Sequence, residues 1–279
     1  MRIDKFQASG NDFIIIEGFD NDNNKRKEIT EKACNRHFGI GSDGALFLDK
    51  KGDKTFYFRI WNNDGTEAEI SGNGLINAGA YVFDKYGDDV GNEVVFDTKA
   101  GDRVVKLIKE EDNRYFLKVD MGEPKFSSED IPFYDGTQYQ KIIDYPLNIN
   151  RRVFSATILS VGNPHTVIFL DNFPSSFELQ QIGREIESHP FFPNKTNVEF
   201  VRMIDKKTME ILFWERGAGE TQSSGSGSTA SVVAARLKRL VDEKVRVITR
   251  AGDIIIECQE DKIFLNGVSA HVFSGEIFI

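Results

Sequence analysis

The chain has 279 residues, a length sufficient for one large or two medium domains, each with its own hydrophobic core. Its composition, 40% hydrophobic and 28% charged, is that of an ordinary globular protein. A net charge of −9 disfavours nucleic acid and anionic membranes as partners, so we expect a small-molecule ligand. No stretch approaches the about 20 apolar residues of a membrane span, and "MRIDKFQASGND" lacks the apolar core of a signal peptide. We therefore expect a cytoplasmic protein.

Short strand-like runs, rich in β-branched and aromatic residues, recur along the chain between glycine, asparagine and aspartate residues. In chain order they are "FRIW", "EVVFDT", "DRVVKLI", "RYFLKVDM", "SATILSV", "HTVIFL", "NVEFVRMI", "MEILFW", "VRVITR", "DIIIEC" and "KIFLNG". Two runs with apolar residues at helical spacing, "LINAGAYVFDKYG" and "TASVVAARLKRLVDEK", each follow a glycine-rich loop. Many short strands with few helices predict an α+β fold rather than a doubly wound one.

A change in composition predicts where the chain divides. Gly, Pro and Ser concentrate in "MGEPKFSSEDIPF", residues 121–133. The final run, "HVFSGEIFI", is expected to return to the first half. The predicted N-terminal half is thus residues 1–120 plus 268–279, and the C-terminal half is residues 121–267, with the active site in the cleft between them.

The cysteines and histidines indicate neither a disulfide nor a metal site. Cys34 lies in a helix-like segment and Cys258 in the strand-like "DIIIECQED", so both are expected to be buried side chains. The four histidines are far apart in the sequence and lack the close spacing of metal ligands. We expect no metal.

The two halves repeat each other. Residues 58–74, "FRIWNNDGTEAEISGNG", align without gaps with residues 211–227, "ILFWERGAGETQSSGSG", at an offset of 153. That offset superposes Trp61 on Trp214 and Ser71 on Ser224. At an offset of 152, "SGNDFIII" matches "VGNPHTVIF", so that Asn11 meets Asn163. Two nearly equal offsets indicate an internal duplication.

Each repeated glycine loop precedes a helix, so its backbone N–H groups and the positive end of the helix dipole favour an anion. Two such loops facing each other predict a two-sided carboxylate site with Ser71 and Ser224 on opposite faces of the ligand. A single glycine-serine loop is commonly only a turn or a linker. "GSGSTA" also fits the dinucleotide pattern G-x-G-x-x-A, but no strand runs straight into it, and the missing Gly-Lys-Ser/Thr excludes a P-loop.

The motifs "GNDF", "NNDGTEAEISGNG", "VGNPH", "TNVEF" and "ERGAGETQSSGSG", in this order and at these separations, closely resemble diaminopimelate epimerase. The resemblance extends from Gly10 to the C-terminal "HVFSGEIF". It implies a cofactor-independent amino-acid racemase or epimerase built from two similar domains, each a sheet curled around a central helix. It also implies the synthesis of lysine and peptidoglycan precursors, in which LL-diaminopimelate is converted to the meso form.

The family's mechanism uses two cysteines, one as thiolate base and one as thiol acid, on either side of the α-carbon. The resemblance places them where this chain has Ser71 and Ser224. A thiol at a helix N-terminus can ionise near neutral pH, whereas a serine hydroxyl hardly ever ionises without an adjacent base. We therefore expect this Ser/Ser form to be inactive or nearly so while it still binds substrate. Deliberate inactivation is the favoured explanation; the alternative is a natural relative that binds amino acids without catalysis, or a dehydratase or isomerase with a carboxylate base.

Other family residues carry over one at a time. The resemblance implies substrate-binding side chains or backbone groups at these positions: Asn11, Asn62, Gly72, Asn73, Asn163, Asn197, Glu215, Arg216, Gly225 and Ser226. His165 and Glu215 match residues taken to tune the catalytic thiols. Local explanations remain open, since Asn in "GND" or "GNP" is often only a turn former, His165 can be a core histidine and Arg216 an ion-pair residue.

Two departures leave the substrate open. Gly44 stands where some members have a polar side chain that contacts substrate, and Ile76 where an arginine is common. Racemases of lysine, histidine and other amino acids share the scaffold. The resemblance implies a homodimer, with Phe273 at a contact position, although Phe273 can equally be a strand core residue.

Overall fold

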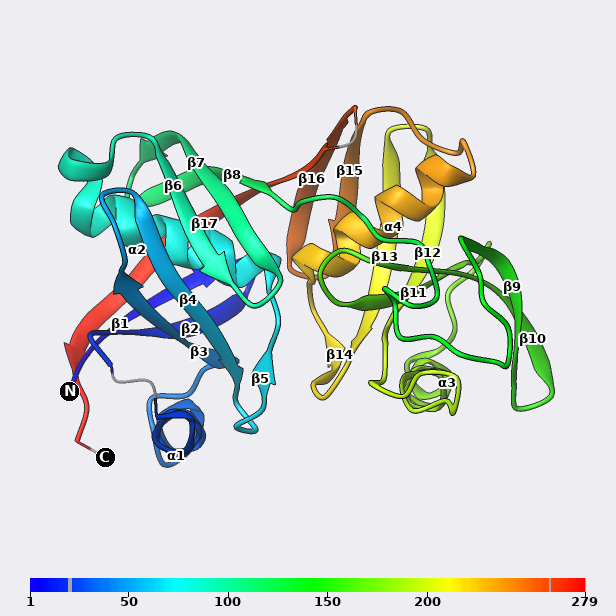
Figure 1. Ribbon diagram of the computed structural model, residues 1–279, viewed down its shortest axis with the longest axis horizontal. Coiled ribbons are helices and arrows are strands. Elements are labelled where there is room, and N and C mark those ends of the chain that lie inside the picture. Colours follow the sequence, from blue (N-terminus) through cyan, green and yellow to red (C-terminus); the bar gives the residue numbers. More distant parts are fainter. Residues whose placement is uncertain (20–21, 261, 279) are drawn as a thin grey trace. The chain divides into compact units, whose positions relative to one another are not determined.

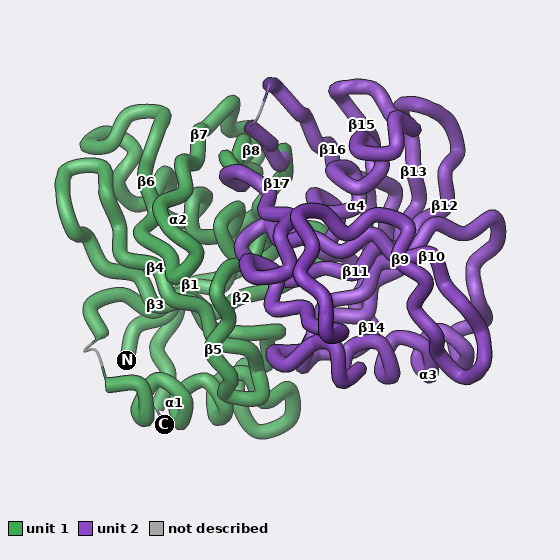
Figure 2. Tube along the Cα trace, turned by 45° about the vertical axis from the view of Figure 1, so that its right-hand side comes forward, with its two compact units in different colours: residues 1–120, 266–279 green, residues 121–265 purple. Residues whose placement is uncertain are grey.

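The computed structural model describes residues 1–19, 22–260 and 262–278. The chain divides into two compact units, coloured separately in Figure 2: unit 1 is Met1–Asp120 with Asn266–Ile279, and unit 2 is Met121–Leu265. Each unit is rich in strands and has two helices among the residues described, as expected for the α+β class. No helix in the described part of the chain is long and apolar enough to cross a membrane.

Unit 1 is a sheet that surrounds a helix. Its elements are β1 (Arg2–Ala8), β2 (Asn11–Glu17), α1 (Asn23–Cys34), β3 (Gly44–Lys50), β4 (Thr55–Asn62), β5 (Glu67–Ala68), α2 (Gly72–Val90), β6 (Glu93–Thr98), β7 (Gly101–Glu111), β8 (Arg114–Asp120) and the end of β17 (Lys262–Glu276). Strand β2 pairs antiparallel with β1 and parallel with β3, β3 pairs antiparallel with β4, and β4 pairs parallel with β6. Antiparallel pairs β6–β7 and β7–β8 follow, and β17 pairs antiparallel with β1.

Unit 2 repeats this order after one additional strand. Its elements are β9 (Ile142–Ile149), β10 (Arg152–Ser160), β11 (Pro164–Phe169), α3 (Ser176–Glu187), β12 (Asn197–Asp205), β13 (Thr208–Glu215), β14 (Gly219–Thr221), α4 (Gly225–Leu237), β15 (Lys244–Thr249) and β16 (Gly252–Gln259). Strand β11 pairs antiparallel with β10 and parallel with β12, β12 pairs antiparallel with β13, and β13 pairs parallel with β15.

The sequence repeat is confirmed at the level of strand register. Trp61 lies opposite Glu67 in the β4–β5 pair, and Trp214 lies opposite Glu220 in the β13–β14 pair. Each tryptophan belongs to the hydrophobic cluster beneath the outer helix of its unit, α1 in unit 1 and α3 in unit 2. The two halves are therefore pseudo-symmetric copies of one fold.

The central helices α2 and α4 are buried on all sides over most of their length, as Figure 1 shows for α2 within its strands. Every residue of α2 from Gly72 to Phe83 is buried, and so is every residue of α4 from Gly225 to Ala235. Both segments are rich in Gly, Ala, Ser and Asn, whose small side chains permit close approach of a strand. At Gly227, an added Cβ atom would lie 2.8 Å from Oε1 of Glu199 on β12.

Helix α4 is shorter than the sequence pattern predicts. The run "TASVVAARLKRLVDEK" continues to Lys244, but the helix ends at Leu237 because Arg239 adopts a left-handed conformation with φ 58°. The N–H of Leu240 donates to the carbonyl of Ala235, and that of Arg239 donates to Arg236. These two bonds form a Schellman motif, which satisfies carbonyls at the end of the helix.

Both cysteines are free and buried, as predicted. Cys34 is the last residue of α1 and belongs to the hydrophobic cluster of unit 1, and Cys258 lies on the buried face of β16. Burial raises the pKa of the Cys34 thiol to about 11, with the hydrogen bond from Ser42 acting in the opposite direction.

Candidate active site: two matched helix N-termini

In unit 1, Ser71 is the N-cap of α2. Its backbone is extended, with φ −141° and ψ 127°, and its Oγ accepts a 3.0 Å hydrogen bond from the N–H of Gly74. Because the first N–H groups of a helix have no partner within the helix, those of Gly72 and Asn73 lie at the end where the dipole favours an anion. Ser71 closes the turn while Gly72 and Asn73 supply the first donors.

In unit 2, Ser224 is the N-cap of α4 with nearly the same geometry. Its φ is −140° and its ψ is 121°, and its Oγ accepts a 3.2 Å hydrogen bond from the N–H of Gly227. In addition, the Ser224 hydroxyl donates to Oε1 of Glu215, at 2.6 Å, from the end of β13. The two serines thus have equivalent backbone and capping geometry. Among the described residues, Ser224 donates to a carboxylate of its own unit, and Ser71 does not.

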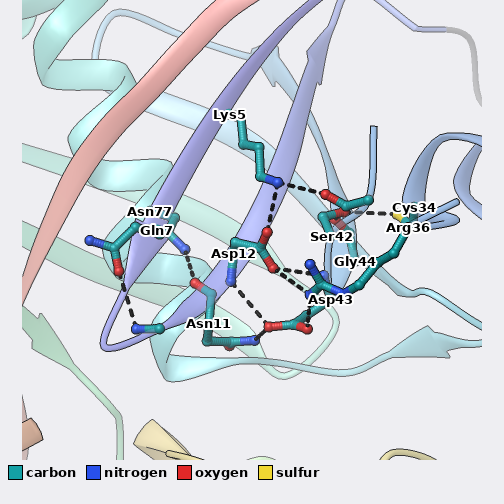
Figure 3. A network of polar contacts seen from close by, with 12 residues as sticks. Lys5, Gln7, Asn11, Asp12, Cys34, Arg36, Ser42, Asp43, Gly44 and Asn77 are labelled. Atoms are coloured by element: carbon teal, nitrogen blue, oxygen red, sulfur yellow. Dashed lines mark hydrogen bonds and ion pairs between the residues drawn. The ribbon is translucent and has the colours of Figure 1, made fainter. Parts of the chain in front are cut away.

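The amide of Asn11 has a fixed orientation, shown in Figure 3. Its Nδ2 donates to Oδ2 of Asp43, at 2.7 Å, and its backbone carbonyl accepts from Nδ2 of Asn77 on α2, at 3.2 Å. A carboxylate only accepts hydrogen bonds, so the NH₂ group must face Asp43. The side-chain carbonyl of Asn11 therefore remains available as an acceptor.

Asn62 lies at the end of β4, one strand removed from β2. Register places Gly44 of β3 opposite both Phe13 of β2 and Asn62. The Nδ2 of Asn62 donates to the hydroxyl of Thr66, at 3.0 Å, which leaves its Oδ1 as an acceptor as well. Asn11 and Asn62 thus lie at the ends of β2 and β4, the two strands that flank β3 in unit 1.

In unit 2, the side chain of Asn163 is bonded to a histidine and not to a carboxylate. His165 bonds through Nε2 to Oδ1 of Asn163, at 2.8 Å, and through Nδ1 to Oε1 of Glu199, at 2.7 Å. When Nε2 of His165 carries a proton, it donates to Oδ1 of Asn163, and Asn163 then presents its NH₂ group, which suits a carboxylate ligand. His165 is fully buried and connects Asn163 to a second buried group.

Glu199 is a site residue that the sequence analysis did not single out. It is fully buried on β12, and burial raises the pKa of its carboxyl while the adjacent His165 opposes that rise. Its sequence signal is a lone acidic residue within the apolar run "NVEFV". A carboxyl in such an apolar run predicts a buried polar partner, because burying an unpaired carboxyl is costly.

Asn197 and Arg216 are joined through their local structure. The backbone N–H of Arg216 donates to Oδ1 of Asn197, at 2.9 Å, and Nδ2 of Asn197 donates to the carbonyl of Pro164, at 2.9 Å. The guanidinium of Arg216 also donates to the carbonyl of Asn194, at 3.1 Å. Asn197 consequently holds the β11, β12 and β13 ends together.

The two departures from the family pattern, Gly44 and Ile76, lie at closely packed positions. At Gly44, a Cβ atom would lie 2.4 Å from the carbonyl oxygen of Trp61, so a side chain there requires the backbone to shift. Ile76 lies against Gly267, where a Cβ atom would be 3.1 Å from Ile76 Cδ1. Both positions are closely packed in unit 1.

Comparison with known proteins identifies the scaffold. The model of the family "Diaminopimelate epimerase" matches residues 5–127 and 157–272. The diaminopimelate epimerase of Acetivibrio thermocellus is 38% identical over 279 residues, which cover 99% of this chain and 98% of that one.

Solved structures share the fold at low sequence identity. A predicted epimerase from Pseudomonas aeruginosa superposes with a TM-score of 0.73 at 12% identity, covering 100% of this chain and 99% of that one. A probable proline racemase from Agrobacterium radiobacter gives a TM-score of 0.69 at 11% identity, covering 100% and 93%. The chain therefore shares its two-unit α+β fold with a predicted epimerase and a probable proline racemase.

The family is established by the family model and the full-length curated relative together. The chain belongs to the diaminopimelate epimerase family.

Proposed function

We propose that this chain has the site of a diaminopimelate epimerase, in which an amino-acid α-carbon is inverted by two-base proton transfer without a cofactor. In this proposal the halves 1–120 plus 268–279 and 121–267 enclose the substrate in the cleft between them. The observation that carries it is the matched capping geometry of Ser71 and Ser224, each preceding a buried helix of its own unit. Residues 71 and 224 are the two proton-transfer positions.

The reaction requires a base on one face of the α-carbon and an acid on the other. The base removes the α-proton, the resulting negative charge spreads into the substrate carboxylate, and the acid returns a proton to the opposite face. Backbone N–H groups of Gly72, Asn73, Gly225 and Ser226 stabilise that carboxylate at the two helix N-termini. Charge stabilisation of this kind requires no metal or organic cofactor.

The serines support binding but not proton transfer. A thiol has an ordinary pKa of about 8.5, which a helix N-terminus lowers toward neutrality, whereas a hydroxyl stays protonated. Glu215 accepts the proton of Ser224 in a hydrogen bond, yet an ordinary carboxylate is far too weak a base to ionise it. We therefore propose that this Ser/Ser form binds substrate and turns it over negligibly.

The polar side chains divide according to what they present. Asn11 and Asn62 present acceptors suited to an ammonium group, and Asn163 presents a donor suited to a carboxylate. Glu215 and Arg216 offer opposite charges for the ammonium and carboxylate of an amino acid. His165 and Glu215 tune the groups at the transfer positions, and Asn197 supports the same strand ends.

The substrate we propose is LL-diaminopimelate, which is converted to the meso form in the synthesis of lysine and peptidoglycan precursors. The curated relative that is 38% identical over its full length has this activity as its name. Lysine and histidine are the alternative substrates. A natural amino-acid-binding protein without catalysis is the alternative function, because the serine caps leave both helix starts intact.

We further propose a cytoplasmic homodimer. Val272 and Phe273 lie on β17 beside β1, with exposed fractions of 51% and 40%, and large exposed apolar side chains on one strand suit a contact with a second copy. Light scattering of the purified chain tests the stoichiometry, and a monomer at all concentrations contradicts it.

The test restores both thiols. In the variant Ser71→Cys/Ser224→Cys, incorporation of deuterium from solvent at the α-carbon is followed for LL-diaminopimelate, lysine and histidine. Exchange of diaminopimelate in preference to the other two supports the proposal. Exchange of lysine or histidine alone reassigns the substrate, and exchange of none of them refutes the racemase site.

A further inference from the structure

Asp43 and Arg36 lie outside the positions that the family motifs assign to substrate, yet Asp43 bonds to the amide of Asn11, and Arg36 bonds to Asp43 (Figure 3). Asp43 is in the loop between α1 and β3, and Arg36 follows the end of α1. Neither residue is a member of the two helix N-termini. Through Asp43, both residues are linked to the Asn11 side chain at the start of β2.

Every oxygen of the Asp43 carboxylate is occupied by a donor. Oδ2 accepts from Nδ2 of Asn11, at 2.7 Å, and from the backbone N–H of Asp12, at 3.2 Å. Oδ1 accepts from the Arg36 guanidinium, at 2.7 Å. These donors fix the carboxylate from both sides, so its contact with Asn11 has one geometry.

The cluster is closed by reciprocal bonds to Asp12. The N–H of Asp43 donates to Oδ1 of Asp12, at 3.1 Å, and the Arg36 guanidinium donates to the same atom, at 3.0 Å. Lys5 forms an ion pair with Oδ2 of Asp12, at 2.7 Å. Two cations thus balance two carboxylates, and the loop that carries Asp43 is bonded to the start of β2.

We infer that Asp43, held by Arg36, is a positioning residue that fixes the polarity of Asn11. The NH₂ group of Asn11 is directed to Asp43, and its carbonyl oxygen is presented as an acceptor for an ammonium group of the ligand. A flipped amide would place its oxygen against the Asp43 carboxylate, which has no proton to donate. This inference rests on the proposed function for the identity of the ligand, but the orientation of Asn11 does not depend on any ligand.

A purely structural role for the cluster makes a different prediction. If Asp43 only fastened the loop to β2, its replacement would lower stability, and any loss of ligand affinity would follow that loss of stability. If it sets polarity, affinity depends on which atom residue 11 presents. The double variant Asn11→Asp/Asp43→Asn separates these cases. It keeps one hydrogen bond between residues 11 and 43, and residue 11 again presents an oxygen to the ligand.

The first measurement uses the ligand-free chain. In the ¹⁵N-asparagine-labelled protein, the Asn11 side-chain amide, assigned through its disappearance in Asn11→Asp, is expected to have one proton shifted downfield by the carboxylate. Asp43→Asn should remove that shift. An Asn11 amide without the shift in the unaltered chain overturns the inference, whatever the ligand proves to be.

The second measurement is calorimetric binding of diaminopimelate to the full chain. We expect Asp43→Asn to weaken binding about tenfold, the size of one hydrogen bond with a charged partner, and Asn11→Asp/Asp43→Asn to recover to within about threefold. Lys5→Met is the matched control, because it removes an ion pair from the cluster without contacting the Asn11 amide. It should lower the melting temperature and leave affinity within about twofold.

The outcomes separate the two proposals. If the exchanged variant binds no better than Asp43→Asn, or if Lys5→Met weakens binding as much as Asp43→Asn, the positioning role is refuted. If the unaltered chain does not bind diaminopimelate, the proposed substrate fails, and the amide shift alone then decides the orientation.

Discussion

The hydroxyl of Ser224 donates to the carboxylate of Glu215 across 2.6 Å, while the same oxygen accepts the N–H of Gly227 at the start of α4. Ser224 therefore connects the end of β13 to the N-terminus of the central helix. Ser71 has the equivalent bond to Gly74 in unit 1. Because Ser224 has the additional bond to Glu215, we expect its loss to lower the free energy of unfolding more than the loss of Ser71.

Replacing either serine by alanine should remove an N-cap and lower the free energy of unfolding by about 1 kcal/mol. Ser224→Ala should cost more than Ser71→Ala, because Glu215 also loses a donor. Denaturant unfolding measures both effects. Ser175→Ala, which removes the capping box of the outer helix α3, gives the scale for an exposed cap. Equal stability of Ser224→Ala and the unaltered chain would contradict the capping role.

The close approach of β12 to α4 predicts that Gly227 does not tolerate a larger residue. An alanine Cβ would lie 2.8 Å from Glu199 and 3.0 Å from Phe213, so Gly227→Ala should destabilise the fold by about 1–3 kcal/mol. Gly87→Ala is the matched control in α2, since no heavy atom outside its own helix lies within 4 Å of the added Cβ. That change should instead stabilise by about 0.5–1 kcal/mol. The prediction fails if the two substitutions have the same sign.

The two native cysteines should be unreactive in the folded chain. Both are buried, and the pKa of Cys34 is raised to about 11, so little thiolate forms at pH 8. A disulfide reagent that reports free thiols should label neither cysteine rapidly in the native chain and both in concentrated guanidinium chloride. Rapid labelling of Cys34 without denaturant would contradict this prediction.

Stability should depend on pH through Asp12. Burial raises the pKa of its carboxyl, but hydrogen bonds and charge from Lys5 and Arg36 more than offset this, and the folded pKa lies below the ordinary 3.8. A carboxyl with a depressed folded pKa stabilises the fold above its unfolded pKa, and this contribution is lost as pH falls through the folded value.

The unfolding free-energy difference between the unaltered chain and Asp12→Asn should thus be constant near neutrality and shrink below about pH 4. Chemical denaturation at a series of pH values measures it. Asp53→Asn, in an exposed loop before β4, serves as the control for a surface carboxylate. A difference that does not change down to the acid limit would show that Asp12 is not bound in its ionised form.

The sequence predicted the α+β class through its many short strands and few helices, and the duplication of the two halves through its internal repeat. Trp61 and Trp214 align at one offset, and the structure gives them the same strand register with Glu67 and Glu220. Helix α3 is not among the elements predicted above, although "SSFELQQIGREIE" holds a capping box at Ser175 and Glu178 and apolar residues at helical spacing. That helix could have been found, because its signals are local.

The polarity of the site could not be found in the same way. Asn11 and Asp43 are 32 residues apart, and whether Asn11 presents an oxygen or an NH₂ group depends on that one contact. His165 was a candidate from its motif, but its partner Glu199 lies in a different strand. Motifs name the residue types at such positions, while contacts between distant strands decide how their side chains are oriented.

The most direct test of the central claim is deuterium exchange at the α-carbon of LL-diaminopimelate in three forms of the chain. The unaltered chain should show no exchange above background, and Ser71→Cys/Ser224→Cys should exchange the α-proton and form the meso isomer. Ser71→Cys/Ser223→Cys, which moves the second thiol one residue from the N-cap of α4, should stay inactive. Exchange by the unaltered chain at a rate equal to that of the restored variant, or none by the restored variant, would contradict residues 71 and 224 as the proton-transfer positions.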